Sequence, residues 1–209
     1  MLAGQLRGAR LLDVGTGDGT YAIEAARRGA RSVGLDLDPR MIEAARRRAA
    51  AAGVPVALCR GTVEALPFAD ASFERVVAIT VLCFVRDVGA AFSEMARVLV
   101  PGGRLVVGEL ARWSTWAVER RLRGRGGDPL WRTARFWSRR DLAAEATRAG
   151  LHVDAVEGAI FYPRCASLAR TLKRLDPLLT RIGAPGAAFL ALSAGKAGLF
   201  QRVSCAEPG

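Results

Sequence analysis

Apolar and polar positions follow two different periods along the first half of the chain. Five short apolar runs have the length of strands, and several are rich in valine and isoleucine: 10–14, 31–36, 54–59, 73–80 and 104–109. Three segments between them repeat apolar residues every three or four positions, which predicts amphipathic helices: 20–28, 39–52 and 88–99. Because strands and helices alternate with short turns, the pattern predicts a parallel sheet covered by helices, the α/β class.

The alternation is interrupted after Glu109. Segment 110–137 contains all four tryptophans among many arginines and predicts an insertion. Beyond it we expect a helix, a strand and a last strand, at 139–149, 151–157 and 186–193. The sequence therefore predicts one domain over residues 1–209 that carries one insertion.

Charge is the unusual feature of the composition. The formal net charge is +11, and 29 of the 31 basic residues are arginines. Such a surface can attract nucleic acid, anionic lipid or an acidic substrate. The simpler explanation, which we favour, is a general bias toward alanine, glycine and arginine.

Several classes of site and location find no support in the sequence. The four cysteines lack CxxC or other metal-ligand spacing, so no metal site is predicted. The longest uncharged stretches, 76–85 and 184–194, are well short of the ~18 residues that span a bilayer. The start lacks the apolar core of a signal peptide. We expect a cytoplasmic protein with reduced thiols.

Three glycines alternate directly behind the first predicted strand, in LLDVGTGDGT. Gly15, Gly17 and Gly19 permit a tight turn that brings backbone N–H groups close to a ligand at a helix N-terminus. Their spacing is G-x-G-x-G, whereas dinucleotide sites use G-x-G-x-x-G. Asp13 precedes the loop and disfavours a pyrophosphate, so the motif suits a ligand with a positive end.

A second acidic motif follows the second predicted strand, in GLDLDP. Asp36 lies about 20 residues beyond the loop, where a carboxylate can accept both hydroxyls of a ribose. Asp38 is better placed to cap the helix that begins at Pro39. The glycine loop with Asp13 and the carboxylate of Asp36 together predict a nucleoside ligand with a cationic amino-acid tail.

Residues 8–110 resemble the class I S-adenosylmethionine-dependent methyltransferases. Four segments carry the resemblance in family order: LLDVGTGDG, VGLDLDPRMIEAARRRA, GTVEALPFADASFERVVA and EMARVLVPGGRLVVGE. They are similar to the glycine loop, the ribose station, the adenine loop with the fourth strand, and the helix leading into strand five. The resemblance implies a doubly wound, Rossmann-like sheet of seven strands with helices on both faces. That sheet would be mostly parallel, with an antiparallel last strand.

The resemblance also implies which residues bind S-adenosylmethionine, whose product is S-adenosylhomocysteine. Asp13 would orient the loop or the cofactor's ammonium group, Asp36 would accept the ribose hydroxyls, and the Val63 N–H would meet the adenine. The other implied contacts are Gly15, Thr16, Gly17 and Gly19 beneath the methionine and ribose, Leu37 and Met41 beside the adenine, Thr62 at its edge, and Thr80 near the methionine end.

Two features depart from the family pattern. The family commonly has an aspartate where Thr62 stands; a hydroxyl accepts more weakly than a carboxylate, and Glu64 is a second candidate. Relatives often carry helices ahead of the first strand, whereas nine residues precede it here. We expect 110–137 to cover the substrate instead. Its tryptophans and arginines also fit a shallow membrane contact or simple anchoring of helices to the core.

The expected activity is methyl transfer to a small molecule, of lipid-like or quinone-like character. Methyl transfer requires mainly the alignment of the acceptor with an already activated methyl group. Glu109, at the end of strand five, is the candidate catalytic residue; its alternative role is a cap or an ion pair. RNA methylation and a non-catalytic module that binds the cofactor or a partner are the alternative functions. The glycine spacing opposes a nicotinamide enzyme.

Overall fold

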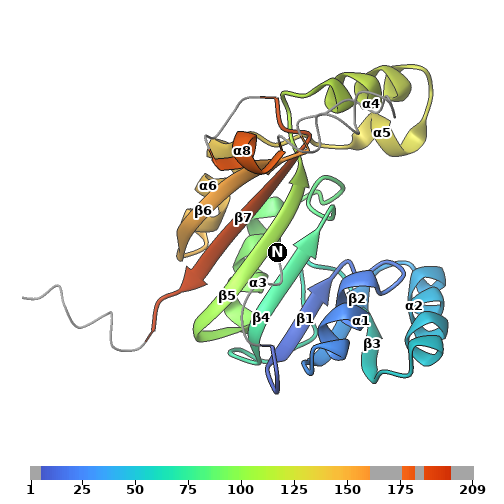
Figure 1. Ribbon diagram of the computed structural model, residues 1–209, viewed down its shortest axis with the longest axis vertical. Coiled ribbons are helices and arrows are strands. Elements are labelled where there is room, and N and C mark those ends of the chain that lie inside the picture. The colour runs from blue at the N-terminus through green and yellow to red at the C-terminus, as the bar shows by residue number, and fades with distance from the viewer. Residues whose placement is uncertain (1–5, 161–175, 182–185, 199–209) are drawn as a thin grey trace, which may run out of the picture.

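The centre of the molecule is a seven-stranded sheet, seen in a computed structural model that describes residues 6–160, 176–181 and 186–198 (Figure 1). The strands are β1 (Arg10–Val14), β2 (Arg31–Asp36), β3 (Val56–Arg60), β4 (Phe73–Ile79), β5 (Leu99–Leu110), β6 (Leu151–Ala159) and β7 (Phe189–Lys196). Their order is β3-β2-β1-β4-β5-β7-β6. Among the described strands, β7 alone runs antiparallel to its neighbours. The predicted doubly wound sheet with an antiparallel last strand is confirmed.

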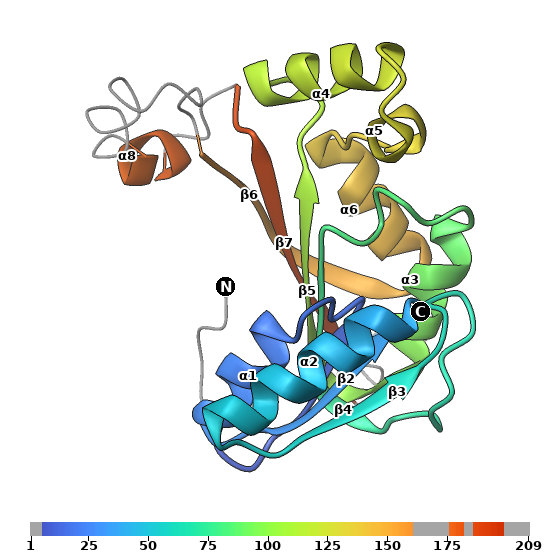
Figure 2. The same ribbon diagram turned by 90° about the vertical axis from the view of Figure 1, so that its right-hand side faces the viewer.

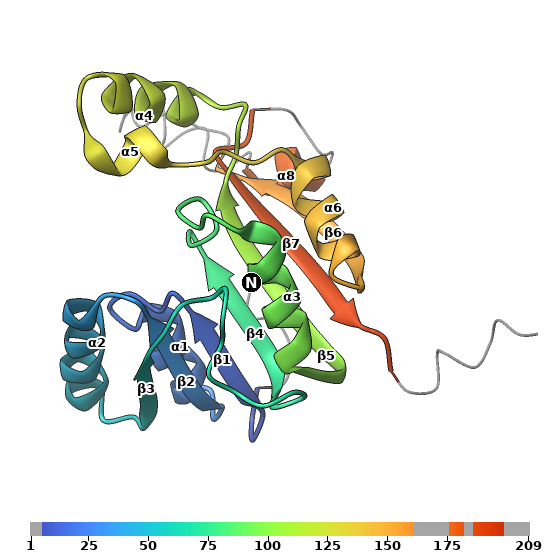
Figure 3. The ribbon, with the colours of Figure 1, turned by 180° about the vertical axis from the view of Figure 1, so that it is seen from behind.

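Helices cover both faces of this sheet. The described helices are α1 (Thr20–Arg27), α2 (Pro39–Ala52), α3 (Val88–Val98), α4 (Thr115–Arg125), α5 (Pro129–Thr133), α6 (Arg139–Arg148) and α8 (Asp176–Arg181). α1 and α2 lie against one face, and α3 and α6 lie against the other (Figure 3). α4 and α5, from the predicted insertion, stand beyond the carboxyl ends of the parallel strands (Figure 2).

The central strands are buried on both faces. Leu11, Leu12 and Val14 in β1 and Val76, Val77 and Ala78 in β4 are at most 2% exposed. Consecutive apolar residues point to opposite faces of a strand, so such a run is stable only where helices cover both sides. This is why the continuous apolar runs predicted the middle of the sheet.

Two aspartates set the beginnings of the long helices. The Asp38 carboxylate accepts a hydrogen bond from the backbone N–H of Arg40 at 2.8 Å, and α2 ends at Gly53 in the left-handed conformation (φ 64°). Asp87 caps α3 in the same way. Caps of this kind stabilise a helix by about 1 kcal/mol each.

Some strand boundaries differ from the predicted ones. The structure begins β5 at Leu99, directly after α3, because Leu99 pairs with Phe73 of β4 before the PGG turn. β7 begins at Phe189, three residues later than predicted. The reason is its register, in which Phe189 pairs with Leu110 and Gly195 with Arg104.

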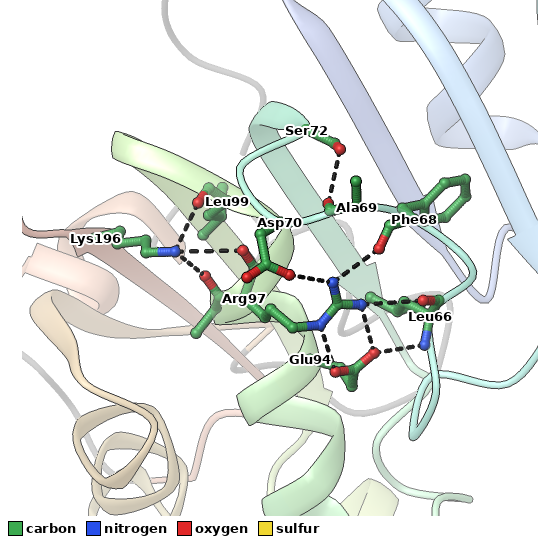
Figure 4. Close-up of polar contacts among 10 residues, drawn as sticks. Leu66, Phe68, Ala69, Asp70, Ser72, Glu94, Arg97, Leu99 and Lys196 are labelled. Atoms are coloured by element: carbon green, nitrogen blue, oxygen red, sulfur yellow. Dashed lines mark hydrogen bonds and ion pairs between the residues drawn. The ribbon is translucent and has the colours of Figure 1, made fainter.

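Arg97, on α3, forms hydrogen bonds that hold the loop between β3 and β4 against that helix (Figure 4). Its guanidinium donates to the carboxylates of Glu94 and Asp70, each at 2.7 Å, and to the carbonyl oxygens of Phe68 at 2.8 Å and Leu66 at 3.1 Å. Glu94 also accepts from the Leu66 N–H at 2.7 Å. Arg97 holds the pKa of Glu94 below its usual value. One guanidinium therefore bonds two carbonyl groups and one carboxylate of this loop.

Lys196, at the end of β7, donates hydrogen bonds to the carbonyl groups at the carboxyl end of α3 (Figure 4). Its Nζ donates to the carbonyl oxygens of Ala96, Arg97 and Leu99 at 2.7, 3.3 and 2.8 Å. The last carbonyls of a helix lack partners within the helix, and a cation there is also favoured by the helix dipole. The last strand is thus joined to the middle of the chain.

Arg97→Ala should lower the free energy of unfolding by about 2 kcal/mol, because two carboxylates and two carbonyls lose a charged donor. Arg46→Ala is the matched control, since Arg46 forms an i,i+3 pair with Glu43 on the exposed side of α2. Surface pairs of this kind contribute less than about 0.5 kcal/mol. Urea denaturation measures both. Equal losses would contradict the role given to Arg97.

Candidate functional site

A cavity of about 430 Å³ opens at the carboxyl ends of β1, β2 and β4. Its wall consists of residues from four short segments that each follow a strand: 14–15, 35–37, 61–64 and 80–86. Parallel strands place their carboxyl ends at one edge of a sheet, and ligands of doubly wound folds bind there. Three segments recognised in the sequence, the glycine loop, the segment at Asp36 and the segment at Thr62, therefore meet at one place. They are joined there by a fourth segment, 80–86, of which only Thr80 was predicted. We number these four wall segments along the chain as the first to the fourth station.

Asp13 stabilises the glycine loop from behind. Its buried carboxylate accepts hydrogen bonds from the Thr16 hydroxyl at 2.7 Å and from the Ala22 N–H at 3.1 Å. Burial raises the pKa of Asp13 from 3.8 to about 7. Both bonds join parts of the turn between β1 and α1, so Asp13 shapes the loop and does not line the cavity.

Two of the loop glycines are required by close packing. At Gly15 (φ 63°) a Cβ would overlap a methyl group of Val81, and at Gly19 (φ 85°) it would lie 3.1 Å from the Cβ of Ala45 on α2. Gly17 differs, because no atom lies within 4 Å of the position that its Cβ would take. The loop is thus packed at its two ends and open in the middle.

Asp36 connects the loop to the second station. One carboxylate oxygen accepts from the Gly17 N–H at 2.8 Å and the other from the Asp38 N–H at 2.9 Å. Each carboxylate oxygen can accept two hydrogen bonds, so both retain capacity for a ligand. The neighbouring Leu37 lines the cavity and is 65% exposed. This wall suits a ligand that is hydroxylated at one point and apolar beside it.

The third station brings Thr62 and Glu64 together. The Thr62 hydroxyl forms a short hydrogen bond with the Glu64 carboxylate, and both residues line the cavity beside Val63. Donation to Glu64 occupies the hydroxyl proton, which leaves the hydroxyl oxygen and the carboxylate as acceptors. The pair therefore provides acceptors where the family commonly has one aspartate.

The fourth station holds wall residues that the sequence analysis missed. Phe84, Val85 and Arg86 line the cavity together with Thr80. Phe84 is 43% exposed, and its ring centroid lies 6.5 Å from that of Trp131 on α5. An aromatic residue and an arginine shortly after a strand end were the available signal. The turn itself depends on the positive φ of Thr80 (58°), which the sequence does not reveal.

Glu109 lies behind the fourth station and is fully buried. Its Oε1 accepts from the N–H groups of Val81 at 2.9 Å and Leu82 at 2.6 Å. Among the described residues, Oε2 has no partner at ordinary hydrogen-bond distance, and the Cys83 thiol adds only a weaker polar interaction. Burial raises the pKa of Glu109 from 4.5 to about 7. Its contacts are with the backbone of the cavity wall.

The structure thus divides the predicted site residues into two sets. Those that line the cavity are Gly15, Asp36, Leu37, Thr62, Val63 and Thr80. Those that lie outside its lining are Asp13, Thr16, Gly17, Gly19, Met41 and Glu109.

Metal sites and membrane-spanning helices are both absent from the described part of the chain. In that part, no cluster of three or more histidine, cysteine or acidic residues could hold a metal ion. Its helices are all too short or too polar to cross a membrane.

Comparisons with known proteins agree with this geometry. Residues 12–107 match the family model described as a methyltransferase domain. The chain is 36% identical over 184 residues to a Mycobacterium tuberculosis protein described as uncharacterized, covering 88% of this chain and 59% of that protein. It is 42% identical over 100 residues to the demethylmenaquinone methyltransferase of Thermus thermophilus, covering 47% and 46%.

A solved structure extends the similarity to the whole fold. The chain superposes on an S-adenosylmethionine-dependent methyltransferase from Thermotoga maritima with a TM-score of 0.69 and 25% identity, covering 91% of this chain and 83% of that one. The chain spans about half of the length of the two curated relatives named above, 59% and 46%.

The stability of the protein should fall as pH rises from about 4.5 to about 7. In this window an unfolded carboxyl group ionises while the buried Glu109 and Asp13 keep their protons, so the folded state binds more protons. Glu109→Gln, which retains an acceptor for Val81 and Leu82, should remove up to roughly 3 kcal/mol of this fall. Urea denaturation across the window measures it. If the free energy of unfolding of the variant depended on pH as it does in the wild type, the raised pKa of Glu109 would be contradicted.

Proposed function

We propose that the chain, which carries a methyltransferase domain at residues 12–107 and the class I S-adenosylmethionine-dependent methyltransferase fold, transfers a methyl group from that cofactor to a small apolar acceptor. The observation that carries the proposal is the cavity wall. A ribose-type acceptor at Asp36, an apolar surface at Leu37 and paired acceptors at Thr62 and Glu64 lie along one cavity. They follow one another in the order of the parts of an adenosyl ligand.

Each part of the cofactor has a suitable group in the wall. Asp36 would accept the ribose hydroxyls with its remaining lone pairs, and Leu37 would contact the adenine face. The Val63 backbone and Thr62 would meet the adenine edge. The methionine end would pass the open part of the glycine loop at Gly17 toward Thr80. When bound, S-adenosylmethionine supplies a methyl group already activated on a sulfonium sulfur.

The acceptor would approach from the side of α4 and α5. Trp131 of α5 lies beside Phe84 of the cavity wall, with ring centroids 6.5 Å apart. The Arg120 guanidinium lies 5.0 Å from the Trp131 ring and 5.3 Å from the Trp116 ring. Rigid aromatic groups at this wall favour an apolar, planar acceptor. The demethylmenaquinone methyltransferase among the relatives supports the same chemistry. We therefore propose segment 110–137 as the acceptor cover.

Glu109 would act as a positioning residue in this reaction. It holds the backbone of Val81 and Leu82, and Val81 packs against Gly15 beneath the proposed methionine end. Alignment of the acceptor with the methyl group is the main catalytic requirement. A wall held from behind by hydrogen bonds meets that requirement without contact between Glu109 and the acceptor.

Asp36→Asn should raise the dissociation constant of S-adenosylhomocysteine by about 10- to 100-fold, because charged acceptors are lost at the ribose. Asp38→Asn is the matched control: it changes the next acid along the chain, which caps α2 and pairs with Arg40. This control should retain the wild-type affinity. Isothermal titration calorimetry measures both. Stabilisation by NAD and not by adenosyl compounds would contradict the proposed cofactor.

Phe84→Ala should reduce turnover about tenfold or more while the affinity for S-adenosylhomocysteine stays near the wild-type value, because the acceptor loses a wall of its site. Phe84→Leu keeps an apolar side chain and should restore most of the activity. Transfer of a tritiated methyl group to a prenylated naphthoquinol is the assay.

The same assay separates the alternative functions. Cofactor binding without transfer to any tested acceptor would favour the non-catalytic module. Transfer to RNA and not to the quinol would favour the RNA enzyme.

A further inference from the structure

The outer face of α4 carries an apolar stripe that no described element covers. Val118 and Leu122, one helical turn apart, are 54% and 58% exposed. Trp113, which precedes the N-cap Ser114, is 71% exposed. A residue before the N-cap and the fourth helical residue lie on the same side of a helix, so Trp113 extends the stripe formed by the other two. Large apolar groups concentrated in this way mark an interaction surface.

The opposite face of α4 is already packed. Gly124 is buried so closely against the backbone of Trp131 that a Cβ would lie 2.7 Å from its carbonyl oxygen. Ala117 is buried as well, and Arg120 lies over the rings of Trp116 and Trp131. The orientation of α4 is therefore set by its inner face. The outer stripe is available for a partner.

Positive charge surrounds this stripe. Segment 110–137 contains seven arginines and two acidic residues. Three arginines lie in the second half of α4: Arg125 is exposed, Arg123 is exposed and pairs with Asp128 at 2.9 Å, and Arg121 lies over the Phe136 ring. At the other end, Trp113 helps to line a second cavity of about 290 Å³, together with Arg139 and Arg140 at the start of α6. The apolar stripe thus has arginines at both ends.

We infer that this face of α4 docks on an anionic lipid surface. Tryptophan and aliphatic side chains would enter the boundary between headgroups and acyl chains, while the arginines meet the phosphates, as in interfacial amphipathic helices. A single-stranded nucleic acid would require exposed aromatic platforms for its bases, and two of the three stripe residues are aliphatic. Lipid is therefore the partner that the composition of the face favours.

The location of this face determines where the first cavity would lie after docking. α4 lies at the extremity of the molecule, beyond the carboxyl ends of the parallel strands, which is the end where the first cavity opens (Figures 1 and 2). A molecule docked through α4 would hold that cavity near the lipid. Only this consequence rests on the proposed function; the docking itself is measured without cofactor or acceptor.

The apolar part of the inference is tested with the double variant Val118→Ser, Leu122→Ser. Its partition onto phosphatidylglycerol-containing vesicles, followed by co-sedimentation, should be about tenfold or more weaker than that of the wild type. Leu178→Ser is the matched control, because Leu178 on α8 is similarly exposed (56%) and lies outside the stripe. It should bind vesicles as the wild type does. A far-UV circular dichroism spectrum and a urea denaturation midpoint like those of the wild type verify that each variant is folded.

The charged part is tested with the double variant Arg139→Gln, Arg140→Gln. It should lose most of the preference for anionic over phosphatidylcholine vesicles, because the headgroup phosphates lose two cations. Arg46→Gln, Arg47→Gln is the matched control, a neighbouring pair on α2 at the other edge of the sheet. This control should keep the preference.

Three results would overturn the inference. The first is equal vesicle binding by the wild type and the Val118, Leu122 variant. The second is equal binding of the wild type to neutral and anionic vesicles. The third is no vesicle binding, combined with RNA binding that the stripe variant loses. Each is independent of methyl transfer, so failure here leaves the proposed function standing, and the reverse also holds.

Discussion

The hydrogen bonds that Asp13 accepts are the interaction on which the site depends. A buried carboxylate at the end of β1 holds both the glycine loop and the first turn of α1. Asp36 can reach the Gly17 N–H, and Val81 can pack against Gly15, only while the loop keeps this shape. Removing a carboxylate from water is costly, and bonds to its own turn offset that cost. The glycine motif and the acid before it therefore form one structural unit.

Glu109 supports the opposite wall of the cavity by the same principle. Both acids stand at the ends of parallel strands, and both turn toward the backbone of the loops that form the wall. The wall at Cys83 also supports the insertion, because the Cys83 carbonyl accepts from the Arg135 N–H at 2.8 Å and its side chain packs with Phe136. The cofactor wall and the proposed acceptor cover thus share one loop. A site held in this way from behind keeps its geometry without using its ligand-facing groups.

The alternation of strands and helices and the place of the cavity were predictable, because buried strands, glycine turns and strand-end acids leave local patterns in the sequence. The environment of Glu109 was not predictable, since its burial depends on a loop that folds back after the positive φ of Thr80. The burial of individual tryptophans was not predictable from the sequence either. Trp137 is buried because its backbone pairs with Leu110 and residue 112, whereas Trp113 precedes a helix cap and stays exposed. Such differences in burial arise from tertiary contacts, and the local sequence of the segment does not show these contacts.

The contacts of Lys196 also bear on how the chain folds during its synthesis. α3 and β5 leave the ribosome long before the side chain that completes the carboxyl end of α3, about 100 residues later in the chain. β7 then inserts between β5 and β6, so both of these strands wait with an unpaired edge until it arrives. Unpaired edges invite pairing with other chains. The half of the sheet that follows β4 is therefore the part most exposed to misassembly on the ribosome, and the part on which a chaperone would act.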